Sequence, residues 1–246
     1  MCRLFAIHSS QPVGVRQAFA ALKVQSFEHK DGWGIARFPN SGVEVERGLE
    51  PAHASARFDR LGESLQERTL LAHIRLASVG GVVACNTHPF SGSGWAFSHN
   101  GTLNQFSRCR AALEQMIAPD LLAAVQGDTD SERCFALFLT HLRDTGATTP
   151  RAMARALALT IHAARACVDA GAEKPSSVNV LASNGETLIA ARAGKSLVRL
   201  RQPEGWVVAS EPMWADAIWQ SIPEASVSVY DSALQAHDFQ IADLLA

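Results

Sequence analysis

The second residue of the chain has the features of a catalytic nucleophile. If the initiator Met1 is removed, Cys2 becomes the first residue and carries both a thiol and a free α-amine. An α-amine titrates near pH ~7.7–8.0 and a free thiol near ~8.5, so both exchange protons close to neutrality. A nucleophile that carries its own base needs no separate His or Asp partner. The alternative is a structural cysteine, because residues 2–7 also fit a buried first strand.

Two charged residues could recognise the ends of an amino-acid substrate. Arg75 stands near the end of a predicted strand, and its planar guanidinium matches a carboxylate through two parallel hydrogen bonds. Asp130 could pair with a substrate ammonium group. Each residue has an ordinary alternative. Arg75 could form a surface salt bridge, and Asp130 could complement a helix dipole as a first-turn acid.

Asn100 and Gly101 could stabilise a developing oxyanion. The side-chain amide of Asn100 and the following backbone N–H are two donors that could converge on one oxygen. Asn-Gly is also a common turn dipeptide, so an ordinary turn explains the same two residues. The preceding segment from Asn86 to Phe90 is expected to be a rigid loop.

Hydrophobic patterns predict the elements that must position these residues. Strands are expected at residues 2–8, 35–38, 43–45, 69–78, 95–98, 178–181, 187–191, 197–200, 206–209 and 227–230, with hairpin turns at 39–42 and 184–185. Helices are expected after Pro12 and Gly14, over 103–125 with a break at Pro119, from a capping box at 129–132, and over 150–168 up to Gly171. Strands, then helices, then strands indicate one α+β domain with mostly antiparallel sheets over residues 1–246.

Composition excludes several classes of protein. The 246 residues are 47% hydrophobic with a net charge of −2, which indicates neither a nucleic-acid partner nor a charged membrane surface. The five cysteines include no C-x-x-C pair, so a disulfide framework or a zinc site is not expected and a reducing cytoplasm fits best. The sequence has no signal-peptide pattern and no apolar run of ~18–20 residues, the length of a membrane span.

Together these stretches resemble the class II glutamine amidotransferase domain, whose nucleophile is its N-terminal residue. The chain looks most like the stand-alone YafJ-like and EgtC-like group, and the resemblance covers most of the sequence. It lies at residues 1–4, 29–34, 72–75, 86–90, 99–101 and 128–132, and more weakly at 209–212.

The resemblance implies a fold and a role for each candidate residue. Cys2 would be the nucleophile with its amine as base, Arg75 would bind the glutamine α-carboxylate, and Asp130 would bind the α-ammonium group. Asn100 and Gly101 would form the oxyanion hole. The implied fold is the Ntn-hydrolase sandwich of the α+β class, in which two mostly antiparallel sheets lie between helix layers in the order αββα.

Other positions of the matching stretches fit the family less fully. Amidotransferases fused to synthase domains often carry a Thr-His pair shortly after the arginine, and here the matching residues are Ser78 and Val79. Ser78 can still donate a hydrogen bond to a substrate carboxylate, whereas Val79 cannot. Trp33 would sit in a loop close to the nucleophile, as a substrate-binding residue. His73 and His99 are expected to be structural, and no role is derived for His88.

The reaction implied is hydrolysis of the side-chain amide of glutamine to glutamate and ammonia through a thioester on Cys2. A γ-glutamyl amide or dipeptide hydrolase using the same residues is the alternative, and a non-catalytic regulatory domain is a third. No cofactor and no metal are expected. The expected partner is glutamine or a γ-glutamyl small molecule, with a separate ammonia-accepting protein and a homodimer left open.

Overall fold

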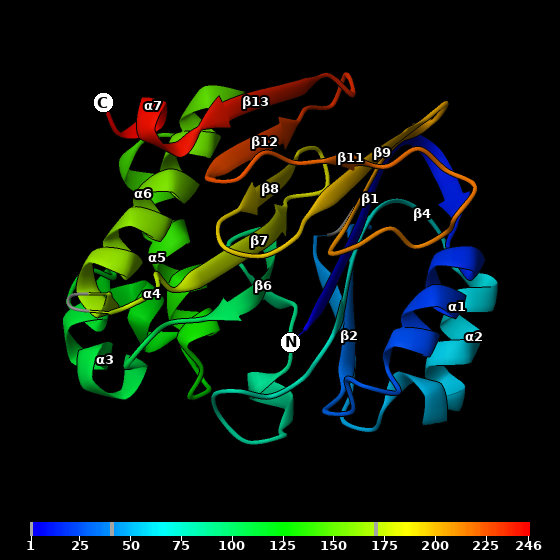
Figure 1. Ribbon diagram of the computed structural model, residues 1–246, viewed down its shortest axis with the longest axis horizontal. Coiled ribbons are helices and arrows are strands. Elements are labelled where there is room, and N and C mark those ends of the chain that lie inside the picture. Colours follow the sequence, from blue (N-terminus) through cyan, green and yellow to red (C-terminus); the bar gives the residue numbers. More distant parts are fainter. Residues whose placement is uncertain (1, 40–41, 170–171) are drawn as a thin grey trace.

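The computed structural model describes residues 2–39, 42–169 and 172–246, and its strands form two antiparallel sheets (Figure 1). Within the described residues, the first sheet has seven strands in the spatial order β11-β9-β10-β1-β4-β2-β3. Their bounds are β1 Arg3–Gly14, β2 Trp33–Arg37, β3 Glu44–Gly48, β4 Gln66–Ile74, β9 Val198–Gln202, β10 Gly205–Ala209 and β11 Gln220–Ser221.

The second sheet lies face to face with the first (Figure 1). Among the described residues it has six strands in the order β13-β12-β8-β7-β6-β5. Their bounds are β5 Phe90–Gly92, β6 Trp95–Thr102, β7 Ser177–Ser183, β8 Leu188–Arg192, β12 Ser226–Tyr230 and β13 Ala236–Gln240. The prediction of two mostly antiparallel sheets is confirmed.

Helices cover the outer face of each sheet (Figure 1). Two pack on the first sheet, α1 Arg16–Gln25 and α2 Ala56–Ser64, near the short 3-10 helix η1 Ala52–Ala54. The others lie on the side of the second sheet: α3 Phe106–Glu114, α4 Pro119–Ala123, α5 Asp130–Asp144, α6 Pro150–Val168 and α7 Ile241–Leu245. A further 3-10 turn, η2 Ala84–Asn86, precedes β5. In the described part of the chain, no helix combines the length and apolar character needed to cross a membrane.

The alternation of side chains along β1 explains why the molecule has four layers. Leu4 and Ala6 point toward the second sheet and join an apolar cluster between the sheets that includes Leu181. Phe5 and Ile7 point the other way and join the cluster beneath α1 and α2. Successive side chains of a strand point to opposite faces, so one strand supplies two cores. The layer order αββα is therefore as predicted.

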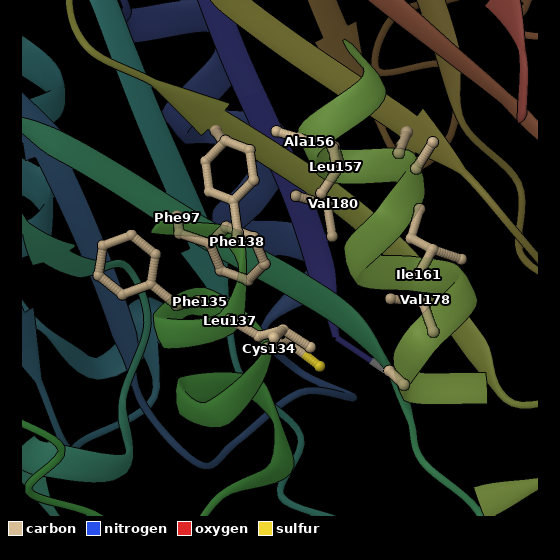
Figure 2. Packing of buried hydrophobic residues seen from close by; sticks show 14 of the residues in the cluster. Phe97, Cys134, Phe135, Leu137, Phe138, Ala156, Leu157, Ile161, Val178 and Val180 are labelled. Carbon is tan, nitrogen blue, oxygen red and sulfur yellow. The ribbon is translucent and has the colours of Figure 1, made fainter. Parts of the chain in front are cut away.

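A second core lies between the other sheet and its helices. Figure 2 shows Phe135 and Phe138 of α5 and Ile161 of α6 packed against the strand residues Phe97 and Val180. The ring centroids of Phe97 and Phe135 are 5.4 Å apart, and those of Phe97 and Phe138 are 5.9 Å apart. Truncating one such buried aromatic side chain to alanine typically costs ~3–5 kcal/mol of stability. This packing fixes α5, whose first residue is Asp130, against β6.

The start of α5 is set by its cap. The hydroxyl of Thr129 accepts a hydrogen bond from the backbone N–H of Glu132 at 3.2 Å, as the capping-box pattern predicts. Glu132 does not complete the box, because its carboxylate accepts from the backbone N–H groups of Gln126 and Gly127 instead. The loop before α5 is thereby tied to the first turn of the helix.

Several predicted boundaries are wrong. Strand β1 runs through Gly14 rather than ending at residue 8, whereas the helix predicted after Pro12 and Gly14 is confirmed and begins at Arg16. Strand β4 ends at Ile74, which leaves residues 75–78 in a loop. Strands β5, β11 and β13 and helices α2 and α7 have no counterpart among the predictions. Gly171 and the tip of the hairpin at residues 40–41 lie outside the described residues.

Candidate active site

The segment that carries Cys2 is tied to strand β4 and to the residues that follow β10. Arg3 opposes Ile74 in the ladder between β1 and β4. Leu4 exchanges hydrogen bonds with Ser210, whose hydroxyl accepts from the Leu4 N–H at 2.9 Å and whose own N–H donates to the Leu4 carbonyl at 3.0 Å. The guanidinium of Arg3 donates to Glu211 at 3.2 Å. These contacts hold Cys2 beside the loop that follows β4.

The thiol of Cys2 faces that loop. Its sulfur lies 3.4 Å from both the backbone N–H and the carbonyl oxygen of Leu76. Burial raises the pKa of the Cys2 thiol above its ordinary value, opposed by the hydrogen bond from the Leu76 backbone and by the positive charge of Arg75. The thiol is therefore largely protonated at neutral pH, and a base must remove its proton before it can attack.

Asp31 supports the loop from below, and sequence reasoning gave it no role. Its carboxylate accepts a hydrogen bond from the backbone N–H of Ala77 at 2.7 Å. The neighbouring backbone is also paired, because Arg75 donates to the carbonyl of Gly32 at 2.9 Å and Asp31 donates to the carbonyl of Arg75 at 3.1 Å. The signal was its place in the stretch 29–34, one of those that carry the family resemblance.

Arg75 is buried next to Cys2, with its guanidinium partly committed to the backbone. Its Nη1 donates to the carbonyl of Gly81 at 3.0 Å, and its Nη2 approaches the carbonyls of Val79 and Gly80 at 3.3 and 3.4 Å. A guanidinium has five N–H donors, so these contacts leave capacity for a substrate carboxylate. They also fold residues 79–81 over the arginine.

Asp130 lies at the first position of α5 and is 2% exposed. One carboxylate oxygen accepts from the N–H of Leu103 at 2.8 Å, and the other accepts from the N–H of Ser131 at 2.8 Å. Each carboxylate oxygen can accept more than one hydrogen bond, so an ammonium group could still be bound.

A small cavity connects the predicted recognition residues with the thiol. It measures about 20 Å³ and is lined by Cys2, Arg75, Ser78, Gly101 and Asp130 among others. A cavity needs ~10–15 Å³ of such space to hold one water molecule, so this conformation has room for little more than a single water here.

A much larger cavity opens on the other side of the thiol. It has a volume of about 660 Å³, and its wall includes Cys2, Ser78, Asn100 and Gly101. Residues that line both cavities include Cys2, Ser78 and Gly101, so the two spaces adjoin at the candidate nucleophile. The hydroxyl of Ser78 lies 2.9 Å from that of Thr102.

Asn100 and Gly101 belong to strand β6 and do not form a turn. They oppose Asn179 and Val178 in the ladder with β7, which corrects the predicted end of this strand at residue 98 and removes the turn alternative. Among the hydrogen bonds of residues 2–39, 42–169 and 172–246, none uses the Asn100 carboxamide, which remains free to donate into the cavity. A Cβ at Gly101 would overlap the Ser177 carbonyl, so the close strand approach requires glycine here.

Trp33 is not brought to either cavity. Its ring is fully buried in the core beneath α1 and α2, with its centroid 5.2 Å from that of Phe58 and its Nε1 3.4 Å from Glu50. Trp33 opposes Ile74 in the ladder, and both side chains belong to the core on the helix side of the sheet. The pleat therefore points Trp33 away from the face on which Arg75 lies.

Three buried histidines lie behind the candidate site. The rings of His73 and His88 lie in contact, tilted by 32° with centroids 4.3 Å apart, and neither has a hydrogen-bond partner for its ring nitrogens among the described residues. Burial lowers the pKa of His73 to about 3, and burial also lowers the pKa of His88 well below its ordinary value. His99 is held between Ser131 and the carbonyl of Ser177 at 2.8 and 3.1 Å. All three are neutral at pH 7, because burial also lowers the pKa of His99.

Comparison with known proteins agrees with this arrangement. A family model described as glutamine amidotransferases class-II matches residues 1–206. The probable glutamine amidotransferase DUG3 of Saccharomyces cerevisiae is 27% identical, over 78% of this chain and 63% of its own length. A gamma-glutamyl-hercynylcysteine sulfoxide hydrolase of Mycobacterium tuberculosis is 30% identical, over 87% of this chain and 81% of its own. A putative glutamine amidotransferase of Haemophilus influenzae is 30% identical, over 77% of this chain and 62% of its own length. The chain therefore spans less than two thirds of the length of the yeast and Haemophilus proteins.

Solved structures share the fold at lower sequence identity. A glutamine aminotransferase class-II domain protein from Silicibacter pomeroyi superposes with a TM-score of 0.72 at 24% identity, covering 98% of this chain and 99% of that one. Glutamine phosphoribosylpyrophosphate amidotransferase from B. subtilis gives 0.70 at 15% identity, covering 98% of this chain and 49% of that one.

The layered sheets, the cysteine at the start of β1 and the extent of the family match lead to one assignment. The chain belongs to the class-II glutamine amidotransferase family and is an enzyme with the Ntn-type fold. Within that family it is similar both to proteins named as amidotransferases and to proteins named as γ-glutamyl hydrolases.

Proposed function

We propose that the enzyme hydrolyses the side-chain amide of glutamine to glutamate and ammonia through a thioester on Cys2. The observation that carries the proposal is that Cys2 lines two adjoining cavities. One is lined by Arg75 and Asp130, the charges that complement both α-groups of an amino acid. The other presents Asn100 beside the thiol, where an amide oxygen would acquire charge.

The reaction proceeds in two steps. The α-amine of Cys2, freed by removal of Met1, takes the thiol proton, and the sulfur attacks the amide carbon of the substrate. The amide oxygen becomes an oxyanion, which the Asn100 carboxamide and the Gly101 N–H stabilise. The C–N bond then breaks as the amine returns the proton to the leaving nitrogen, and ammonia departs. Water hydrolyses the γ-glutamyl thioester, which releases glutamate and restores the thiol.

A second candidate is hydrolysis of γ-glutamyl amides with leaving groups larger than ammonia. The cavity of about 660 Å³ next to Cys2 favours it, because release of ammonia alone needs no such volume. The similarity to gamma-glutamyl-hercynylcysteine sulfoxide hydrolases is consistent with this candidate. Under either reaction, residues 1–246 act as one glutamine amidotransferase domain in the cytoplasm, and a separate ammonia-accepting protein is compatible with the first reaction. A homodimer is compatible with both.

One experiment separates these proposals. Purified, processed enzyme is incubated with glutamine and with a panel of γ-glutamyl amides and dipeptides, and released glutamate is measured. Cys2→Ala serves as the control, because it removes the sulfur and little packing. Glutamate release by the native enzyme alone supports the proposal, and the substrate with the highest kcat/KM identifies the leaving group. No release from any compound, or equal release by Cys2→Ala, would refute the thioester mechanism.

A further inference from the structure

The large cavity beside Cys2 contains an unusual concentration of lysine. The sequence has only four lysines, Lys23, Lys30, Lys174 and Lys195, and the last two both line this cavity. They come from segments far from Cys2 in the sequence, one before β7 and one after β8. The cavity wall includes no aspartate or glutamate among the described residues. Its field is therefore positive, with no acidic side chain on the wall to offset it.

The backbone at both lysines is held in place by asparagine side chains. The Asn104 side chain donates to the carbonyl of Lys174 at 2.8 Å and to Asp169 at 2.9 Å. Asn179, which is fully buried, accepts from the N–H of Lys195 at 3.2 Å and donates to its carbonyl at 3.1 Å. These hydrogen bonds therefore fix the backbone of Lys174 and of Lys195 at the wall of the cavity.

The ammonium groups themselves are not engaged. Within the described parts of the chain, neither Lys174 nor Lys195 forms an ion pair, whereas Lys23 pairs with Asp59 at 2.6 Å. Glu173 adjoins Lys174 in the sequence but does not line the cavity, and the carboxylate of Asp169 already accepts from Asn104 and Ser176. The charges in the cavity are available to a ligand.

We propose that this cavity binds the amine half of a γ-glutamyl amide whose leaving group carries a carboxylate, as in a γ-glutamyl dipeptide, and that Lys174 and Lys195 select for that charge. The inference rests on the proposed function, in which the glutamyl α-groups lie on the Arg75 and Asp130 side of Cys2. The leaving amine must then point to the opposite side, into the lysine-lined space. When the C–N bond breaks, the protonated amine departs with its carboxylate paired to the lysines.

The test compares two substrates that differ only in the leaving group's charge. The kcat/KM for glutamate release is measured with γ-glutamylglycine and with γ-glutamylglycinamide, and their ratio is reported for each enzyme. The native enzyme should prefer γ-glutamylglycine by roughly fivefold or more, the value of one favourable partly exposed ion pair. High salt should reduce this preference, because mobile ions screen charges at the cavity mouth.

The variants assign the preference to particular residues. The double variant Lys174→Gln/Lys195→Gln should bring the ratio close to one, and each single variant should lower it. Lys23→Gln, which removes a lysine from the opposite side of the fold, should keep the native ratio. Because both substrates are measured with the same preparation, differences in folded fraction cancel in the ratio. The salt dependence is measured on the native enzyme, so it does not rely on any variant folding correctly.

Several results would overturn the inference. A native ratio near one, a native ratio unaffected by salt, or a preference retained in the double variant would each do so. Hydrolysis of glutamine with no hydrolysis of either γ-glutamyl compound would overturn it while leaving the proposed glutaminase reaction standing. Absence of glutamate release from all three compounds would instead refute the proposed function, and the inference with it.

Discussion

Cys2 is the proposed nucleophile, and its thiol lies in a partly buried environment. Burial raises the pKa of its thiol, so the structure does not activate the sulfur through a low pKa. In the proposed mechanism, activation then depends on a nearby base, which is the α-amine of the same residue once Met1 is removed. The chemistry is therefore sensitive to processing of the first peptide bond.

Processing gives the first prediction. Active enzyme should begin at Cys2, and intact-mass analysis should find it lighter by one methionine than the translated chain. A form that retains Met1 has an amide in place of the amine, so it should release no glutamate. Full activity in a sample shown to retain Met1 would rule out the amine as base.

Asn100 provides the second prediction. Asn100→Ala should lower turnover by roughly 10²–10³, or about 2.7–4 kcal/mol, as expected for loss of one preorganised donor. Asn100→Asp should be at least as damaging, because an anion there repels the oxyanion. KM should change little, since the donor acts mainly once charge has moved onto oxygen. Asn184→Ala, in the hairpin between β7 and β8, is the control and should keep native turnover, whereas normal turnover in both Asn100 variants would exclude the residue from the mechanism.

At the scale of elements, the site depends on strand ends and the loops that leave them. Cys2 precedes β1, and Arg75 follows β4, its antiparallel partner. Asn100 and Gly101 lie in β6, in the second sheet, and Asp130 begins α5. The residues converge because the two sheets face each other, and the loop at 76–81 forms the remaining wall.

The support of that loop gives the third prediction. Asp31→Ala removes the acceptor for the Ala77 N–H, which costs about 1–3 kcal/mol of stability if the group stays buried and unpaired. The loop contacts the thiol through Leu76 and carries Ser78, so kcat/KM for glutamate release should fall roughly tenfold or more, since misplaced catalytic groups lose about that much. Asp59→Ala, which breaks an ion pair with Lys23 on the helix face, is the matched control. Equal activity of the two variants would show that Asp31 does not position the loop.

At the scale of the whole molecule, the interior holds two histidines, His73 and His88, whose burial lowers their pKa and so disfavours the charged form. His73 and His88 are buried without ring hydrogen bonds among the described residues, and a charge on either would be costly. Because the folded protein keeps these histidines neutral, its free energy of unfolding depends on pH.

The fourth prediction follows from this coupling. The pKa of His73 is about 3 in the folded protein, and an unperturbed histidine has a pKa of ~6.5. Between these values the unfolded chain binds a proton that the folded protein does not, so stability is intact above pH ~6.5 and is lost as the pH falls toward 3. His73→Leu should flatten the dependence of the free energy of unfolding on pH in this window. Denaturant titrations at several pH values measure it, and an unchanged slope would contradict the assignment.

Local patterns in the sequence were sufficient to predict most elements of this fold. A buried apolar run indicated the strand near residues 2–8, and the hairpin signal at 184–185 indicated the strand near 178–181. The cap at Thr129 with the helical periodicity after it placed the start of α5. These features depend on residues that are close together in the sequence, so a short stretch is enough to predict them. The roles of Cys2, Arg75, Asp130 and Asn100 came from the family resemblance and remain predictions.

Tertiary structure decided what local patterns could not. Asn100-Gly101 has the composition of a turn, yet pairing with β7 keeps it extended, because a ladder of long-range hydrogen bonds outweighs a dipeptide preference. Trp33 adjoins the nucleophile in the family pattern, yet the pleat turns its ring into the opposite core. The support from Asp31 and Ser210 and the meeting of Lys174 with Lys195 join residues separated widely along the chain. Such contacts depend on how the two sheets pack, which no single stretch of sequence encodes.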